Sequence, residues 1–157
     1  MTQKTAIITG AARGIGLATT DLLRTDGWRV AMVDRDADAL TTEAATRDNV
    51  LAIVADVSSP DDTARMVTQT LDWAGQIDGL VNNAGVARFG PMADTDFTIW
   101  REVMATNLDG VFLCTQISNQ FSKEFEYNLP SNLLDIKSLT YSLLEFKKVE
   151  TLSVLFC

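Results

Sequence analysis

Three glycines follow the first apolar stretch of the chain. In ITGAARGIG, residues 8–16, Gly10, Gly14 and Gly16 are spaced G-x-x-x-G-x-G. A glycine directly after a strand permits a tight turn into a helix. Glycines at the helix start let backbone N–H groups approach a pyrophosphate, where the helix dipole favours negative charge. The motif therefore indicates a dinucleotide-binding turn, with a merely flexible turn as the alternative.

An acidic residue ends the second apolar stretch. WRVAMVD closes at Asp34, 18 residues after Gly16. An acidic residue about 20 residues beyond such glycines hydrogen-bonds the adenosine ribose hydroxyls of a dinucleotide. The Asp34 carboxylate would repel a 2′-phosphate, which favours NAD over NADP, whereas Arg13 and Arg35 nearby favour NADP. The alternative reading of Asp34 is a solvated carboxylate at a strand end.

Apolar runs and helical stretches alternate over the first 110 residues. The runs are nearly continuous, which is typical of parallel strands buried on both faces, and they lie at 6–8, 30–33, 50–54 and 80–81. Helical spacing predicts helices over 15–25, 36–46, from Ser59–Pro60 onward, and 96–107. In the first of these helices the residues expected to face inward are Ile15, Ala18, Leu22 and Leu23. This alternation predicts right-handed βαβ units in a doubly wound α/β sheet.

Composition excludes several function classes. The net charge of −8 argues against a nucleic-acid partner. No apolar run approaches the ~20 residues that a membrane span needs, and the N-terminus lacks a signal-like pattern, so a cytoplasmic location is expected. The chain has no His, which excludes Ser-His-Asp and Cys-His nucleophile systems and His-ligated metals. Cys114 and Cys157 lack metal-ligand spacing, so free thiols and no metal site are predicted.

Five motifs occur together in the order and spacing of one family: TGAARGIG, Asp34, ADV at 55–57, NNAG at 82–85 and TN at 106–107. On these motifs, residues 3–116 resemble the short-chain dehydrogenase/reductase family. The resemblance implies a Rossmann-like parallel sheet with strand order 3-2-1-4. It also implies hydride transfer between a nicotinamide cofactor and a small alcohol or carbonyl substrate.

The resemblance further implies roles for single residues. Asp34 would hold the adenosine ribose, and Asp56 and Val57 would contact the adenine. Asn107 matches the family's helix-kinking Asn, which holds a water in the proton relay; a polar residue in a solvated turn is the alternative. The residues expected along the phosphates and toward the nicotinamide are Gly10, Arg13, Gly14, Ile15 and Gly16. Those expected to pack along the cofactor and stabilise the central sheet are Asn83, Ala84 and Gly85.

The family's catalytic Ser, Tyr and Lys find no counterpart. In the family a Lys four residues after the Tyr lowers the Tyr pKa. Here Tyr127 is followed four residues later by Ser131, and Tyr141 by Glu145, whose carboxylate would raise that pKa. A six- or seven-stranded doubly wound sheet needs upwards of ~180 residues, and only four strands are predicted. We therefore expect an incomplete member, inactive alone, with an exposed edge beside the fourth strand.

Composition changes abruptly near residue 110. Residues 1–110 hold 17 Ala, 9 Gly and 8 Arg, and the last 47 residues hold none. We therefore divide the chain into a dinucleotide-binding portion, 1–116, and a divergent tail, 117–157. The tail is expected to carry a helix whose apolar stripe comprises Ile136, Leu139, Leu143 and Phe146. A short strand in TLSVLFC, residues 151–157, could complete the edge left by the fourth strand.

Three functional readings remain open at this point. The first is a truncated oxidoreductase. The second is a non-catalytic dinucleotide-binding or interaction module. The third is a non-functional product of a frameshift, an unspliced intron or a fusion, which the nucleotide sequence would test through a dehydrogenase frame continuing downstream. A homo-oligomer is compatible with the resemblance, although the family's usual dimer helices include one that this chain lacks.

Overall fold

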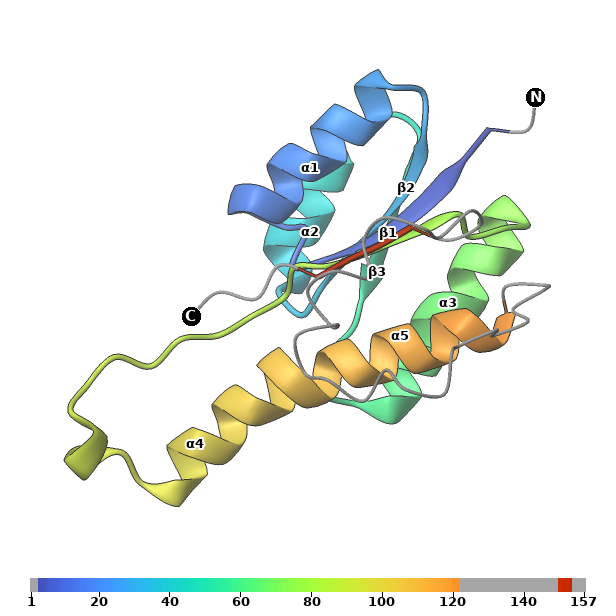
Figure 1. The fold of residues 1–157 in the computed structure, drawn as a ribbon. Coiled ribbons are helices and arrows are strands. Elements are labelled where there is room, and N and C mark those ends of the chain that lie inside the picture. Colours follow the sequence, from blue (N-terminus) through green and yellow to red (C-terminus); the bar gives the residue numbers. More distant parts are fainter. Residues whose placement is uncertain (1–2, 122–149, 154–157) are drawn as a thin grey trace.

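Five parallel strands form the sheet of the computed structural model, which describes residues 3–121 and 150–153 (Figure 1). The strands are β1 (Thr5–Thr9), β2 (Arg29–Asp34), β3 (Val50–Val54), β4 (Gly79–Asn82) and β5 (Glu150–Ser153). Their order is β3-β2-β1-β4-β5. The four predicted strands and the expected order 3-2-1-4 are therefore confirmed.

Helices cover both faces of the sheet. They are α1 (Gly14–Thr25), α2 (Ala37–Ala44), α3 (Pro60–Ala74), α4 (Phe97–Met104) and α5 (Gly110–Phe121), with a 3-10 turn η1 (Met92–Asp94) and a π-helical segment η2 (Ala105–Asp109). Figure 1 shows α1 and α2 on one face and α3 and α5 on the other. The fold is the predicted doubly wound α/β sheet.

Successive strand residues enter two separate cores. Ile7 packs with Met66 of α3 and Cys114 of α5, whereas Ile8 packs with Leu40 of α2. This alternation follows from the two-residue period of a strand. It explains why the strands read as continuous apolar runs, since both sheet faces are covered. Burial raises the pKa of the Cys114 thiol to about 12, so this cysteine is an inert core residue.

The predicted start of α3 is confirmed in detail. Ser59 is the N-cap, its Oγ accepts a hydrogen bond from the Asp62 N–H at 3.3 Å, and Pro60 occupies the first turn. Gly75 ends the helix in the left-handed conformation, with φ of 78°.

The predicted inward face of α1 is confirmed for Leu23, which packs against the core, and is wrong for Ile15 and Leu22. Ile15 is 53% exposed and Leu22 is 62% exposed, whereas Gly16 and Thr20 are buried. The rotation of α1 is set by the close approach of Gly16 to the turn after β1, and this approach overrides the apolar stripe. The Thr20 hydroxyl donates to the Gly16 carbonyl at 2.9 Å, which satisfies it inside the core.

The edge of β4 is covered. Residues 79–82 pair in parallel register with residues 150–153 of β5, so the expected exposed edge is wrong and the strand expected in 151–157 is confirmed for its first three residues. Residues 154–157, both tyrosines and the helical stripe expected from Ile136 to Phe146 lie outside the described residues. The helix predicted over 96–107 continues through η2 and α5 to Phe121, across the predicted portion boundary at 116.

Candidate cofactor site

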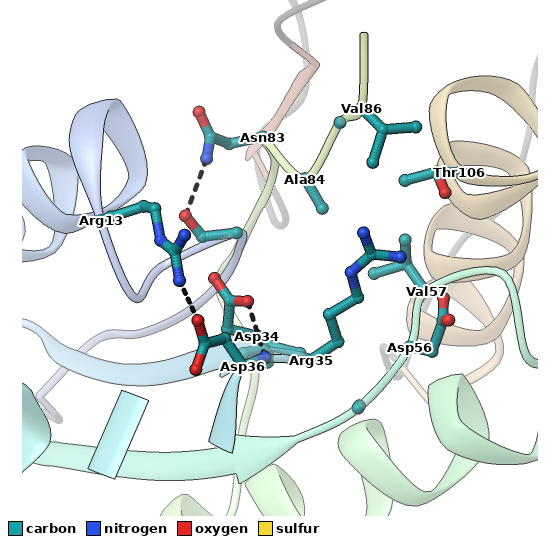
Figure 2. A pocket seen from close by; sticks show the side chains of 14 residues that line it. Arg13, Asp34, Arg35, Asp36, Asp56, Val57, Asn83, Ala84, Val86 and Thr106 are labelled. Carbon is teal, nitrogen blue, oxygen red and sulfur yellow. Dashed lines mark hydrogen bonds and ion pairs between the residues drawn. The ribbon is translucent and has the colours of Figure 1, made fainter. Parts of the chain in front are cut away.

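A pocket of about 420 Å³ opens at the carboxyl ends of the central strands (Figure 2). We call it the charged pocket, and its lining residues are Gly10, Arg13, Val33, Asp34, Arg35, Asp36, Ala55, Asp56, Val57, Asn83, Ala84, Gly85, Val86 and Thr106. Eight residues predicted from the sequence therefore lie together here. Open α/β sheets bind ligands outside the carboxyl ends of their strands, at the point where the strand order reverses, which here lies between β1 and β4.

Two of the three glycines in the turn leave no room for a side chain. Gly10 has φ of 66°, and a Cβ there would lie 2.9 Å from the Ala84 Cα. A Cβ at Gly16 would lie 2.2 Å from the carbonyl oxygen of Gly10. Gly14 has φ of 57°, in the region that favours glycine. The turn therefore brings the start of α1 directly against the end of β1.

The N-terminus of α1 offers donors to an anion. The first N–H groups of a helix have no partner within it, and Arg13, at the N-cap, makes no side-chain cap bond to them. The helix dipole adds positive potential at the same place. This arrangement fits the pyrophosphate role expected for the turn.

Asp34 is held at the end of β2 by two backbone groups. Its Oδ2 accepts the Ala12 N–H at 3.0 Å, and its Oδ1 accepts the Asp36 N–H at 3.1 Å. The residue is half-buried and its carboxylate lines the charged pocket. A carboxylate oxygen can accept more than one hydrogen bond, so Asp34 retains capacity for ribose hydroxyls.

Two arginines flank this carboxylate and behave differently. Arg13 forms an ion pair with Asp36, and the Ala39 N–H together with that guanidinium holds the pKa of Asp36 below its usual range. Arg35 extends across the pocket toward Val57 (Figure 2) and makes no hydrogen bond or ion pair in the described part of the chain. The sequence motifs did not identify Asp36 as a pocket residue.

The loop after β3 is anchored by the start of α3. The Asp56 N–H donates to Asp62 Oδ2 at 2.8 Å, and Asp56 Oδ1 accepts the Ser58 N–H at 2.9 Å. The Asp56 N–H and the Arg65 guanidinium hold the pKa of Asp62 below its usual range. Asp56 and Val57 are thereby fixed at the pocket wall, as their expected adenine contact requires.

The loop after β4 is tied to the end of β1. Asn83 Nδ2 donates to the carbonyls of Thr9 at 3.0 Å and Gly10 at 3.1 Å. Thr9 Oγ1 accepts the N–H groups of Asn83 and Ala84, both at 3.0 Å. Asn83 thus links the end of β1 to the loop after β4, and its expected stabilisation of the sheet and packing along the cofactor stay predictions. Sequence reasoning missed Thr9, whose buried hydroxyl joins the two loops.

A second pocket, of about 520 Å³, lies beside the first and is mostly apolar. We call it the apolar pocket, and its lining residues are Ile15, Asn83, Ala84, Gly85, Val86, Ala87, Val103, Met104, Asn107, Leu108 and Val111. The predicted residues Ile15 and Asn107 lie here, whereas Gly14 and Gly16 line neither of these two pockets.

Asn107 lies in the π-helical segment η2, where a helix irregularity was expected. Its Oδ1 accepts the Val86 N–H at 2.8 Å, and its Nδ2 donates to the Val86 carbonyl at 2.9 Å. Both polar groups of the side chain therefore fix the loop after β4. The expected role with a water in a proton relay stays a prediction.

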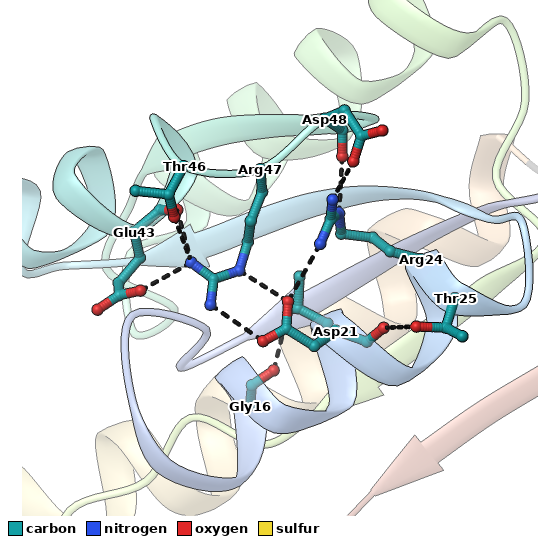
Figure 3. Close-up of polar contacts among 9 residues, drawn as sticks. Gly16, Asp21, Arg24, Thr25, Glu43, Thr46, Arg47 and Asp48 are labelled. Atoms are coloured by element: carbon teal, nitrogen blue, oxygen red, sulfur yellow. Dashed lines mark hydrogen bonds and ion pairs between the residues drawn. The ribbon is translucent and has the colours of Figure 1, made fainter.

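A cluster of charged side chains holds α1 against α2 (Figure 3). The Arg47 guanidinium contacts Asp21 with Nε–Oδ1 at 2.8 Å and Nη2–Oδ2 at 3.0 Å, and Glu43 at 2.7 Å. Arg24 pairs with Asp21 and with Asp48. Arg47 holds the pKa of Asp21 below its usual range. We call these five residues the α1–α2 clamp, which braces the helices that follow the glycine turn and Asp34.

Within the described residues, no group of three or more His, Cys, Asp or Glu side chains could hold a metal ion. None of the helices in 3–121 is long and apolar enough to cross a membrane.

A sequence model of the family described as short chain dehydrogenase matches residues 4–126. The chain belongs to this family. It is 38% identical over 121 residues to the 3-oxoacyl-[acyl-carrier-protein] reductase of Synechocystis, covering 74% of this chain and 49% of that protein. It is 36% identical over 113 residues to 2-(S)-hydroxypropyl-CoM dehydrogenase 3 of Xanthobacter autotrophicus, covering 69% and 44%.

The fold is also similar to solved members of the short-chain dehydrogenase family. The crystal structure of 3-ketoacyl-(acyl-carrier-protein) reductase from Brucella melitensis complexed with NADH matches with a TM-score of 0.71 at 32% identity, covering 73% of this chain and 48% of that one. The chain thus spans about half the length of the relatives it matches. Proteins of this family bind NAD or NADP and a small-molecule substrate.

Proposed function

We propose that this chain binds NAD(H) in the charged pocket and prefers it to NADP(H). The observation that carries the proposal is the Asp34 carboxylate, held by two backbone N–H groups in the pocket that the glycine turn borders. A carboxylate at the end of the second strand accepts hydrogen bonds from ribose hydroxyls and repels a 2′-phosphate. The NADH complex of the Brucella relative gives the proposal independent support.

The residues of the chain fit this cofactor along its length. Asp56 and Val57 would hold the adenine, Asp34 the ribose, and the turn from Gly10 to Gly16 the pyrophosphate. The absence of room for a Cβ at Gly10 and Gly16 supports a turn that a backbone-bound anion can approach closely. The nicotinamide end would extend toward Asn107 in the apolar pocket.

When bound, the nicotinamide supplies the hydride chemistry, and the protein supplies orientation and proton transfer. We propose that this chain alone binds the cofactor without turning over an alcohol or carbonyl substrate. The support is the sequence, in which neither Tyr127 nor Tyr141 is followed by a Lys four residues later. An unperturbed Tyr, with a pKa near ~10, is a poor base at neutral pH.

A titration of the purified chain with NADH and NADPH, followed by nicotinamide fluorescence, tests the proposal. We expect saturable NADH binding that is tighter than NADPH binding. Asp34→Ala should weaken NADH binding by roughly tenfold or more, because hydrogen bonds to a charged group contribute roughly 1.5–3 kcal/mol. Asp38→Ala is the matched control, since it removes the same charge from an exposed position outside the pocket.

The result of the titration distinguishes the three functional hypotheses. NADH binding that depends on Asp34, with no consumption of NADH in the presence of small ketones and aldehydes, supports a non-catalytic NAD-binding module. Turnover would contradict the proposed inactivity and leave an oxidoreductase. A well-folded chain that does not bind NADH would refute the proposal, and an aggregated product would favour a non-functional gene product.

A further inference from the structure

The arginines of the charged pocket and Asp34 favour opposite cofactors. Arg13 and Arg35 both line it, and a guanidinium beside the ribose would attract a 2′-phosphate through charge-assisted, bidentate hydrogen bonds. A preference for NAD(H) therefore requires that this positive charge be compensated. Asp34 engages neither guanidinium directly: its two oxygens accept backbone N–H groups, and no ion pair links it to either arginine in the described residues.

Asp36 supplies the missing compensation. Its Oδ2 forms an ion pair with Arg13 Nη2, while its Oδ1 accepts the Ala39 N–H at 3.1 Å as the N-cap of α2. The Asp36 N–H donates to Asp34 Oδ1 at 3.1 Å. The residue is thus fixed by helix α2 and by Asp34, and Figure 2 shows the Arg13 guanidinium directed toward its carboxylate.

We propose that Asp36 is a second specificity-determining residue of the cofactor pocket, which holds Arg13 in an ion pair so that this guanidinium is not free to bind a 2′-phosphate. This inference rests on the proposed function, because it concerns the same cofactor. It assigns the selectivity to a pair of carboxylates rather than to Asp34 alone. Arg35, which has no ion-pair partner in the described residues, would then remain as the uncompensated cation of the site.

The size of the effect follows from the exposure of the pair. The side chains of Arg13 and Asp36 are 68% and 42% exposed, so the ion pair is weak and is screened by salt. We therefore expect a change of selectivity of about five- to tenfold rather than a complete reversal, since surface pairs contribute little and Asp34 remains in place.

The test is a double-mutant cycle of Asp36→Asn and Arg13→Gln, read as the ratio of NADPH to NADH affinity. Asn is as good an N-cap as Asp, so α2 should remain folded, which circular dichroism checks. Asp36→Asn should raise the ratio about five- to tenfold at low salt, and the gain should shrink near 0.5 M salt as the Debye length falls to a few ångströms, roughly half its value at 0.1 M.

Arg13→Gln added to Asp36→Asn should abolish the gain, because the freed guanidinium is its source. Arg13→Gln alone should change the ratio little, because Arg13 is already engaged by Asp36. Asp38→Asn, two residues later at an exposed position in the first turn of α2, is the charge-matched control and should leave the ratio unchanged.

Two results would overturn the inference. One is an unchanged ratio in Asp36→Asn while NADH still binds, which would refute this inference and leave the proposed function standing. The other is a gain that persists in the double variant, which would show that Arg13 is not the source. Loss of NADH binding by the unaltered chain would instead overturn the proposed function and this inference with it.

Discussion

The two neighbouring pockets differ in how their polar groups are used. The charged pocket gathers Asp34, Asp36 and Asp56 with Arg13 and Arg35 at strand ends. The apolar pocket contains only the side-chain amides of Asn83 and Asn107 among aliphatic and backbone groups. The two pockets share the loop from Asn83 to Val86, but their charged side chains all lie in the first.

The polar side chains of the two pockets also differ in their partners. Each carboxylate of the charged pocket is held by backbone N–H groups or an ion pair from within residues 12–62. In the apolar pocket both polar groups of Asn107 are occupied by Val86. Within the described residues, no titratable side chain lines that pocket to transfer a proton. Among the described residues, the titratable side chains that line the two pockets therefore all belong to the charged pocket.

The largest expected effect on stability and NADH binding comes from placing a side chain in the glycine turn. Gly16→Val places a Cβ 2.2 Å from the Gly10 carbonyl oxygen, which is backbone and cannot move aside cheaply. We expect about 3 kcal/mol lower stability from overpacking and loss of NADH binding. Urea unfolding and NADH fluorescence would measure these effects.

Gly27→Ala provides the control for that variant. Gly27 also has a positive φ, of 84°, but a Cβ there meets nothing within 4 Å. It should cost about 1 kcal/mol through backbone strain alone and leave NADH affinity unchanged. Equal binding losses in the two variants would show that the effect is general destabilisation rather than the shape of the turn.

A smaller effect is expected in the apolar pocket. Asn107→Ala removes the acceptor of the Val86 N–H and the donor to the Val86 carbonyl. We expect about 1–2 kcal/mol lower stability, because two part-buried backbone groups lose their partners. Hydrogen exchange of the Val86 amide should accelerate, and NADH affinity should fall less than in Asp34→Ala.

Asn107→Asp sharpens that measurement. The carboxylate still accepts the Val86 N–H but cannot donate to the carbonyl, so Val86 exchange should be protected more than in Asn107→Ala. If Asn107→Ala weakened NADH binding as much as Asp34→Ala, the two pockets would not be separable as argued.

The smallest effect concerns the α1–α2 clamp (Figure 3). Arg47→Ala should lower stability at pH 7 by about 1 kcal/mol or less, because the partners are partly exposed. The folded-state pKa of Asp21 is lowered by Arg47. The clamp therefore stabilises the fold above the ordinary carboxyl pKa, and this contribution is lost as the pH falls through the lowered value.

Urea unfolding at pH 6 and pH 3 checks this dependence. The unaltered chain should lose more stability between these values than Arg47→Ala. Arg88→Ala is the control, since its pair with Glu102 is exposed and lies far from the clamp along the chain. An identical acid response in the unaltered chain and Arg47→Ala would contradict the assigned cause of the Asp21 shift.

A feature of this fold could be predicted from the sequence when it depends on residues that are close together in the chain. The glycine turn, Asp34 and the cap at Ser59 were predicted because each depends on a few consecutive residues. The rotation of α1 was not, because it is set by Gly16 meeting Gly10 across the turn. The strand that covers β4 was expected in 151–157 from its own apolar residues, about 70 positions after β4. Thr9 was missed because its partners Asn83 and Ala84 lie 74 and 75 positions later in the chain.

The ion pair of Asp36 could not be predicted from the sequence. Its spacing to Ala39 predicts a helix cap, and the ion pair to Arg13 spans 23 residues that only the fold brings together. In the sequence, Asp34 favours NAD whereas Arg13 favours NADP. The structure shows that Arg13 forms an ion pair with Asp36.

The most direct measurement is amide chemical-shift mapping of the intact chain by NMR during NADH addition. We predict saturable shifts at Gly14–Leu17 and at Asp34–Asp36, with the chain showing no NADH consumption when a small ketone is added. A well-dispersed spectrum in which these amides do not respond to NADH would contradict the assignment of the charged pocket as a cofactor site.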